Sequence, residues 1–295
     1  MKTNIGVLLL LLFFPGVYAQ TDTVYYTEED RAVFDNYLLY MAGKDSLPFD
    51  SLMLETASFF LETPYVGATL ETEPEGLVIN LRELDCSTFV ENVIALSRTL
   101  AAGEPAFDAY CDQLRQLRYR EGKIGGYTDR LHYTSDWMYE NDRKQIVKYK
   151  GKEETGGEAY VFDLHYMSSH PDSYRQLKAD SSLIPLIRET EQKVNERTSF
   201  YSLIPRCAID SLAPQIQNGD MVGFVTSIGG LDISHVGIIT RRDGELSFIH
   251  ASSQAMKVIV NTESLKEYAE KGKTCLGIML ARPLPPPLSP PSLLE

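Results

Sequence analysis

The sequence has few cationic side chains for its size, and this shortage excludes several classes of protein. It holds 28 Lys and Arg against 41 Asp and Glu in 295 residues, which gives a formal net charge of -13. Nucleic-acid binders need a dense cationic face, and anionic membranes attract polybasic segments. We therefore expect neither nucleic acid nor an anionic lipid surface as a partner.

Cysteine is also scarce. The four cysteines form no C-x-x-C pair, and they are Cys86, Cys111, Cys207 and Cys275. Four thiols in a chain of this length are too few for a disulfide scaffold. The sequence leaves open whether a disulfide forms among Cys111, Cys207 and Cys275, whereas Cys86 has the sequence context of a thiol used in chemistry.

Long hydrophobic runs are absent except at the N-terminus. Residues 5–14 are apolar, Lys2 precedes them, and Val17-Tyr18-Ala19 provides a small-residue ending after a Pro-Gly break. A run this short cannot span a bilayer, which needs about 20 apolar residues. The pattern predicts a signal peptide at 1–19, and hence a periplasmic or secreted protein with no membrane span after cleavage.

The remaining sequence predicts helices followed by strands. We expect one domain at 20–282 and a proline-rich tail at 283–295. Apolar residues recur with helical spacing over 28–43, 50–61 and 86–102, and then with a period of two over 221–226, 233–240, 246–251, 258–260 and 276–280. The segment at about 104–205 is mixed and polar, and we interpret it as a long irregular insertion. The order indicates an α+β fold with a helix packed on an antiparallel sheet.

Cys86 is expected to open the strongest of these helices. Asp85 is a candidate N-cap, and Cys86 lies on the apolar stripe that continues through Phe89 and Val93. A thiol at a helix N-terminus lies near the positive end of the helix dipole, which favours the thiolate and lowers the pKa of the thiol. The amide N–H groups there are also placed to stabilise an oxyanion. Cys86 is therefore the candidate nucleophile, with a buried structural cysteine as the alternative.

Two histidines lie on adjacent predicted strands. Asp243-Gly244 separates two alternating runs, which is a strong signal for a type I′ hairpin. In that register His235 lies opposite Ser252, and His250 lies opposite Gly237, so both rings share one face as diagonal neighbours. A slip of one residue would place them on opposite faces. We assign His235 as the base for Cys86 and His250 as the residue that orients and polarises His235.

Four motifs together resemble a known family. They are TPYV at 63–66, DCSTFV at 85–90, HVGI at 235–238 and IHASS at 249–253. This order is similar to that of the NlpC-type, papain-like cysteine hydrolases of bacterial cell walls. The resemblance implies a papain-like core with catalytic Cys86, His235 and His250, and it assigns Tyr65 to the oxyanion site.

The number of residues between the cysteine and histidine motifs indicates which subfamily the sequence resembles. Cys86 and His235 are 149 residues apart, so roughly a hundred residues are inserted relative to compact members. The YTDRLHYTSDW segment at 127–137 and the approach to His235 resemble the N-acetylmuramoyl-L-alanine amidase-like subfamily, over roughly 35–282. This implies cleavage of the amide between the muramic lactyl group and L-Ala in soluble (anhydro)muropeptide fragments of peptidoglycan.

Five further residues are candidates for substrate binding. Tyr133 and Trp137 are four residues apart and would form a sugar-stacking platform, although core packing is an equal reading. Asp85 and Ser87 flank the nucleophile and would bind polar groups of the substrate, or else cap the helix. Ser234 precedes the candidate base.

The other histidines raise the question of a metal. No spacing among them and the neighbouring acids matches a known ligand motif, so solvated loops are favoured for His132, Asp163, His165, His170 and Asp172. We expect no metal and no cofactor.

Two rival functions remain at this point. One is an endopeptidase that cuts γ-D-glutamyl–diamino-acid bonds of stem peptides with the same catalytic residues, and the other is a wall-binding module without activity. The sequence does not decide the oligomeric state, or the preference for anhydro ends or stem length.

Overall fold

The protein is described by a computed structural model that covers residues 23–103 and 105–287. The predicted signal peptide at 1–19 and the last eight residues of the proline-rich tail lie outside these ranges. No helix in the described ranges is long and apolar enough to cross a membrane.

Four helices of the N-terminal half form one layer. They are α1 (Glu28–Met41), α2 (Phe49–Phe59), α3 (Cys86–Ala101) and α4 (Phe107–Arg118). The three helices predicted from periodicity are confirmed, with ends within about two residues of the expected bounds. Helix α3 lies between α2, α4 and the sheet, and every residue from Thr88 to Leu100 is buried. This central position requires the apolar stripe read from the sequence.

Within the described ranges, the main sheet is antiparallel and contains eight strands. Its order is β4-β5-β10-β6-β7-β8-β9, with β3 paired to one end of β10. The strands are β3 (Val147–Tyr149), β4 (Glu158–Ala159), β5 (Ser202–Pro205), β6 (Met221–Thr226), β7 (Ile233–Arg242), β8 (Glu245–Ser252), β9 (Lys257–Val260) and β10 (Cys275–Pro283). The five strands predicted from alternation correspond to β6–β10. Helices followed by an antiparallel sheet confirm the mixed α and β plan.

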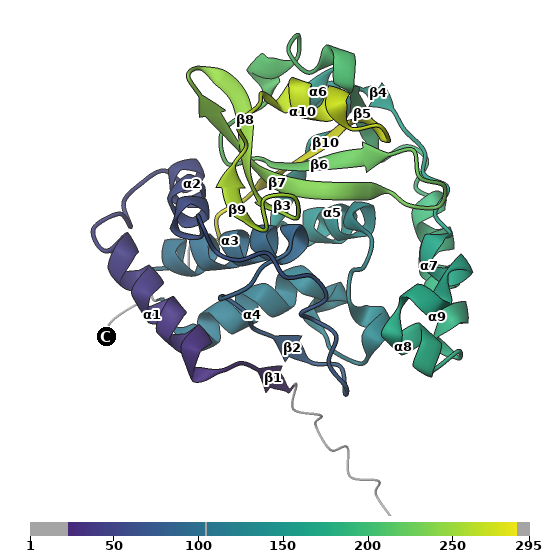
Figure 1. Ribbon diagram of the computed structural model, residues 1–295, viewed down its shortest axis with the longest axis horizontal. Helices are drawn as coiled ribbons and strands as arrows, with labels where there is room; N and C mark the ends of the chain where they lie inside the picture. The colour runs from purple at the N-terminus through teal and green to yellow at the C-terminus, as the bar shows by residue number, and fades with distance from the viewer. Residues whose placement is uncertain (1–22, 104, 288–295) are drawn as a thin grey trace, which may run out of the picture.

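Apolar clusters cover both faces of the sheet. On one face, Val236 and Ile238 of β7 pack with the buried stripe of α3. On the other, Ile239 and Phe248 pack beneath α10 (Leu265–Lys271). Figure 1 shows α3 and α4 on one side of the sheet and α10 on the opposite side. Neighbouring residues of β7 therefore face different environments.

The segment 104–205 differs from the prediction of an irregular insertion. Its described residues contain α4, α5 (Thr134–Arg143) and α9 (Leu183–Asn195), and they supply three strands to the main sheet. Its polarity misled the prediction because many of its charged residues are buried in ion pairs; Asp136, for example, binds both Arg120 and Arg197. The shorter elements are α6 (Lys152–Thr155), α7 (Tyr166–Ser169), α8 (Arg175–Ala179), β1 (Val24–Tyr25) and β2 (Leu77–Val78).

Candidate active site

Cys86 is the first residue of α3, as the sequence predicts. Asp85 is the N-cap, and its Oδ1 accepts the Thr88 amide N–H at 2.8 Å, while Thr88 Oγ1 accepts the Asp85 amide N–H at 2.9 Å. This reciprocal capping box fixes where the helix starts and hence where the thiol lies. The role of Asp85 in the structure is that of a helix cap.

The surroundings of the Cys86 thiol raise its pKa, whereas the sequence predicted a lowered pKa. Burial among protein atoms raises the pKa of Cys86 to about 11, and the Asp85 carboxylate adds to the increase. Hydrogen bonding from the Val236 amide and from Ser87 lowers this pKa, but by less than burial raises it. The expectation of a depressed thiol pKa is therefore wrong for the free protein, in which desolvation outweighs the helix N-terminus.

The histidine hairpin has the predicted register. Strands β7 and β8 pair Arg242 with Glu245 and Ile238 with Ile249, and both turn residues have positive φ, 52° at Asp243 and 87° at Gly244. The regular ladder stops at Ile238, before the histidines. The Val236 amide instead lies within hydrogen-bonding range of the Cys86 thiol, which places the sulfur against β7, one residue from His235.

The two histidines contact each other directly. His235 Nε2 lies 2.6 Å from His250 Nδ1, with the rings nearly perpendicular at 85°. Burial lowers the pKa of His235 to about 4. Burial, together with the neighbouring His235, lowers the pKa of His250 to about 3. Both rings are therefore neutral at pH 7, and His235 is able to accept a proton.

Gly237 permits the close approach of the two strands. A Cβ atom at this position would lie 2.7 Å from the Phe248 ring and 3.3 Å from His250 Cβ. Any side chain would therefore displace Phe248 or His250. Gly237 makes room for the second ring because it has no Cβ.

Tyr65 lies beside the start of α3. Its segment pairs with Leu84, the amide of Val66 donates to the Leu84 carbonyl, and the amide of Tyr65 donates to the Met256 carbonyl. Burial raises the pKa of the Tyr65 hydroxyl, and the nearby Cys86 and Asp85 add to this increase. The structure thus brings together the candidate oxyanion tyrosine, the thiol and the end of the histidine hairpin.

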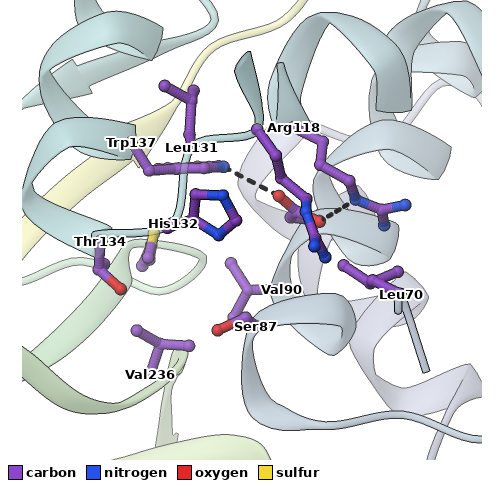
Figure 2. A pocket seen from close by; sticks show the side chains of 12 residues that line it. Leu70, Ser87, Val90, Arg118, Leu131, His132, Thr134, Trp137 and Val236 are labelled. Atoms are coloured by element: carbon purple, nitrogen blue, oxygen red, sulfur yellow. Dashed lines mark hydrogen bonds and ion pairs between the residues drawn. The ribbon is translucent and has the colours of Figure 1, made fainter. Parts of the chain in front are cut away.

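A pocket lies next to the thiol on the α3 face of the sheet. This α3 pocket has a volume of about 140 Å³ and is lined by Leu70, Ser87, Val90, Glu91, Arg118, Arg130, Leu131, His132, Thr134, Trp137, Met221 and Val236. Figure 2 shows the Trp137 and His132 rings on one side and Ser87 and Val236 on the other. Its lining includes Ser87 and Val236, the residues next to Cys86 and His235 in the chain. A pocket of this size holds one part of a ligand rather than a whole drug-sized molecule.

The charges around the α3 pocket are compensated. Arg118 Nε lies 2.7 Å from Glu91 Oε2, and the other Glu91 oxygen accepts Trp137 Nε1–H at 3.1 Å. Arg130 pairs with Glu71 at 3.0 Å and with Glu75 at 3.3 Å. Burial lowers the pKa of His132 to about 3, so that ring is neutral. The pocket therefore suits an uncharged group better than an anion.

The sequence did not single out Glu91, Arg118 or Arg130 as site residues. One signal was present, because Glu91 stands on the buried side of α3, where a charge requires a partner. The partner comes from α4, and nothing in the sequence indicates that pairing.

The α3 pocket contains only some of the predicted substrate residues. Ser87 and Trp137 line it, whereas Tyr133 does not. The Tyr133 side chain is buried in the core, and its hydroxyl donates to Glu191 at 2.7 Å and accepts the Met167 amide N–H at 2.9 Å. The predicted sugar-stacking pair of Tyr133 and Trp137 is thus not formed, because one ring has no open face.

A second, polar pocket lies on the opposite side of β7. This hairpin pocket is lined by Ser234, His235, His250, Ser252, Ser253, Gln254, Ala255, Ile259, Asn261, Thr262, Glu263 and Tyr268. Side chains alternate along β7, so His235 faces this pocket while Val236 faces the α3 pocket. Ser234 is exposed at its edge.

In the two described ranges, no three His, Cys, Asp or Glu side chains converge as metal ligands would. His132 is packed against the Tyr127 ring, and its Nε2 is bonded to the Tyr127 carbonyl, while His165 and His170 are exposed. All four cysteines are free thiols in the structure.

Comparisons with known proteins agree on a family. Residues 55–278 match the model of the N-acetylmuramoyl-L-alanine amidase-like family. The structure is similar to that of an N-acetylmuramoyl-L-alanine amidase from Bacteroides uniformis, with 33% identity, a TM-score of 0.74 and coverage of 80% of this chain and 98% of that chain. A search of the curated proteins finds no match.

Two further solved structures are similar. A protein from Bacteroides fragilis described as a putative xylanase shares 33% identity over 77% of this chain and 99% of its own, with a TM-score of 0.73. A protein from Legionella pneumophila shares 23% identity over 88% of this chain and 95% of its own, with a TM-score of 0.65, and this supports the fold alone.

Proposed function

The chain belongs to the N-acetylmuramoyl-L-alanine amidase-like family, and from this premise we propose that it is a cysteine-dependent amidase of (anhydro)muropeptide fragments. It cleaves the amide between the lactyl group of N-acetylmuramic acid and L-Ala. The assignment of Cys86, His235 and His250 as catalytic residues, and of a papain-like NlpC-type core, belongs to the same proposal.

In the proposed reaction these side chains act in two steps. Cys86 Sγ attacks the lactyl carbonyl carbon, and His235 takes the thiol proton as the C–S bond forms. The Tyr65 hydroxyl and the first amides of α3 stabilise the oxyanion. His235 returns the proton to the leaving L-Ala amine, and water then hydrolyses the thioester to release the sugar acid. His250 holds the His235 ring in place throughout.

Because the Cys86 thiol and the His235 ring are both neutral at rest, the thiol proton moves only during the reaction. A thiol with a pKa of about 11 beside a histidine with a pKa of about 4 keeps its proton at neutral pH. Transfer to His235 therefore accompanies attack on the carbonyl rather than preceding it. The amides around the sulfur then stabilise the charge as it develops.

The observation that carries the substrate assignment is the compensated charge of the α3 pocket beside the thiol. A muramoyl acyl group is uncharged in this region, and a sugar ring suits the faces of Trp137 and His132. The acyl part of a γ-D-glutamyl substrate carries a free carboxylate, for which the pocket offers no unpaired cation. This favours the amidase over the endopeptidase.

The test is digestion of a defined disaccharide–tetrapeptide followed by mass spectrometry of the products. We expect free disaccharide and intact tetrapeptide. Sugar-linked dipeptide would instead identify an endopeptidase, and binding without cleavage would identify a wall-binding module. In Cys86→Ala we expect turnover to fall by at least about a thousandfold. Cys207→Ala, at an exposed thiol, is the matched control and should keep wild-type activity.

We further propose that the protein is exported to the periplasm or secreted. The N-terminal pattern of Lys2, an apolar run and Val17-Tyr18-Ala19 supports this. Fractionation of the native host, with N-terminal sequencing of the mature protein, tests it. A mature chain that begins after Ala19 is expected, and an uncleaved cytoplasmic protein would contradict the proposal.

A further inference from the structure

Three polar side chains form a diagonal row across adjacent strands. On the β8–β9 ladder, Ile259 lies opposite His250, so Asn261, two residues further on, points to the same face as His250. The Asn261 amide N–H donates to the Phe248 carbonyl at 2.8 Å, which continues the ladder beyond β9. His235, His250 and Asn261 therefore follow one another across β7, β8 and the end of β9.

The outer nitrogen of His250 lacks a partner of good geometry. Its Nε2 atom is buried and makes no hydrogen bond with the described residues, although its Nδ1 is bonded to His235. The Asn261 side chain faces this outer nitrogen, and its attraction for a protonated ring raises the pKa of His250 against the effect of burial. An unsatisfied buried imidazole nitrogen is costly, so a small closing movement of the amide is favourable.

The orientation of the Asn261 amide is fixed from its other end. Nδ2 donates to the Glu263 carbonyl at 2.9 Å, so Oδ1 is the atom turned towards His250. The residue is 6% exposed, and the Ser247 hydroxyl donates to its backbone carbonyl at 3.0 Å. The amide is thus held as an acceptor for an N–H group.

We propose that Asn261 is a positioning residue that sets the tautomers of both histidines. Because its oxygen accepts, His250 carries its proton on Nε2 and leaves Nδ1 as an acceptor. His235 then donates from Nε2 to His250, which leaves His235 Nδ1 unprotonated. The free Nδ1 lone pair of His235 is the base for the Cys86 proton. This inference rests on the proposed function for its kinetic consequence but not for the tautomers themselves.

Other titratable groups near His235, His250 and Asn261 do not change the tautomers proposed for the two histidines. His250 faces His235 from β7 and Tyr268 from α10, with ring centroids 4.8 and 5.8 Å away, and Glu263 lies on the wall of the same hairpin pocket. Burial raises the pKa of Tyr268 to about 12, so it stays neutral in the range where the histidines titrate. The carboxylate that shares the hairpin pocket with His250 is that of Glu263, whose backbone carbonyl accepts from Asn261.

The test combines kinetics with nitrogen NMR of labelled histidine. In Asn261→Ala we expect kcat to fall about tenfold with KM unchanged, and the acid limb of kcat/KM to move to lower pH. Asn261→Asp should move the acid limb to higher pH, because a carboxylate favours the protonated ring. In the wild type the NMR spectrum should show Nε2-protonated forms of both His235 and His250.

A matched control separates positioning from folding. Ser247→Ala removes the bond to the Asn261 backbone without touching the imidazole, so it should lower the melting temperature and leave the acid limb in place. Acid limbs that coincide in all three variants would overturn the proposal, as would a His250 protonated on Nδ1. The NMR measurement does not need turnover. A protein without amidase activity but with these tautomers would contradict the proposed function and leave this inference standing.

Discussion

The two sides of β7 are built in different ways. On the hairpin side, His235 and His250 come from one short β-hairpin, are neutral, and contact each other directly. On the α3 side, the pocket is assembled from residues between Leu70 and Val236, and its buried charges are held in pairs that join distant segments. The contact between the two histidines therefore needs only the local geometry of one hairpin, whereas the proposed proton transfer from Cys86 and the recognition of the ligand depend on the whole fold.

The largest expected effect concerns the charge state of Cys86, whose thiol lies against β7 one residue from His235. A thiol with a pKa of about 11 is about one part in 10⁴ thiolate at pH 7. In a Cys207→Ser variant we expect iodoacetamide to alkylate Cys86 thousands of times more slowly at pH 7 than a fully ionised thiolate. The rate should rise about tenfold per pH unit up to pH 9.

A rate that is flat from pH 5 to 8 would instead reveal a thiolate–imidazolium pair. The acid limb of kcat/KM provides a companion reading. His235 has its pKa lowered to about 4, so it stays neutral, and the enzyme active, as the pH falls from 7 to 5. Folding must be monitored in parallel, because buried neutral histidines that protonate near pH 6.5 when unfolded lose their stabilising contribution as the pH falls from there towards 4.

The next largest effect is expected when a charge pair on the α3 side is broken. In Glu91→Gln the amide keeps the shape and the acceptor for Trp137, but it leaves Arg118 as an unpaired charge whose side chain is 3% exposed. We expect the free energy of unfolding to fall by about 3–5 kcal/mol, measured by denaturant titration. We expect the substitution to lower stability and also to raise KM, because the Glu91–Arg118 pair joins α3 to α4 and both residues line the α3 pocket.

Glu55→Gln is the control, since the Lys44–Glu55 pair is solvent-exposed and contributes about 0–1 kcal/mol. If both variants lost the same free energy of unfolding, the buried charge pair at the α3 pocket would stabilise the fold no more than a surface pair does. The comparison between the two sides of β7 would then fail on the α3 side.

The smallest effect is expected at Tyr133. Tyr133→Phe removes the hydroxyl that joins Glu191 and the Met167 amide, so we expect a loss of about 1–2 kcal/mol in the free energy of unfolding. KM for muropeptide should stay unchanged, whereas Trp137→Phe should raise it. An increase in KM for Tyr133→Phe with unchanged stability would restore its predicted role in binding the sugar.

Much of the fold was predictable because its signals are local. The capping box at Asp85, the turn at Asp243-Gly244 and the alternation along β7 and β8 each act over a few residues. Register then placed His235 beside His250 without further information. The strands β6 to β10 were predictable for the same reason, since the alternation of their side chains is also a local pattern.

The rest depends on contacts that are distant in sequence. The pKa of Cys86 is set by the protein atoms around the thiol, and no local motif reveals how many there are. The pairing of Glu91 with Arg118 and the burial of Tyr133 against Glu191 join separate elements. The segment 104–205 was misread because buried ion pairs and solvated charges look the same in a sequence.

The position of β10 has a consequence for how the chain reaches this fold. The strand lies between β5 and β6 and also pairs with β3, yet it comes after every other strand of the sheet in the chain. Until residues 275–283 arrive, β5 and β6 expose unpaired edges, and the two parts of the sheet have nothing to join them. Closure of the sheet therefore waits for nearly the whole chain to emerge from the ribosome. We therefore expect resistance to proteases to appear only after β10 has taken its place between β5 and β6.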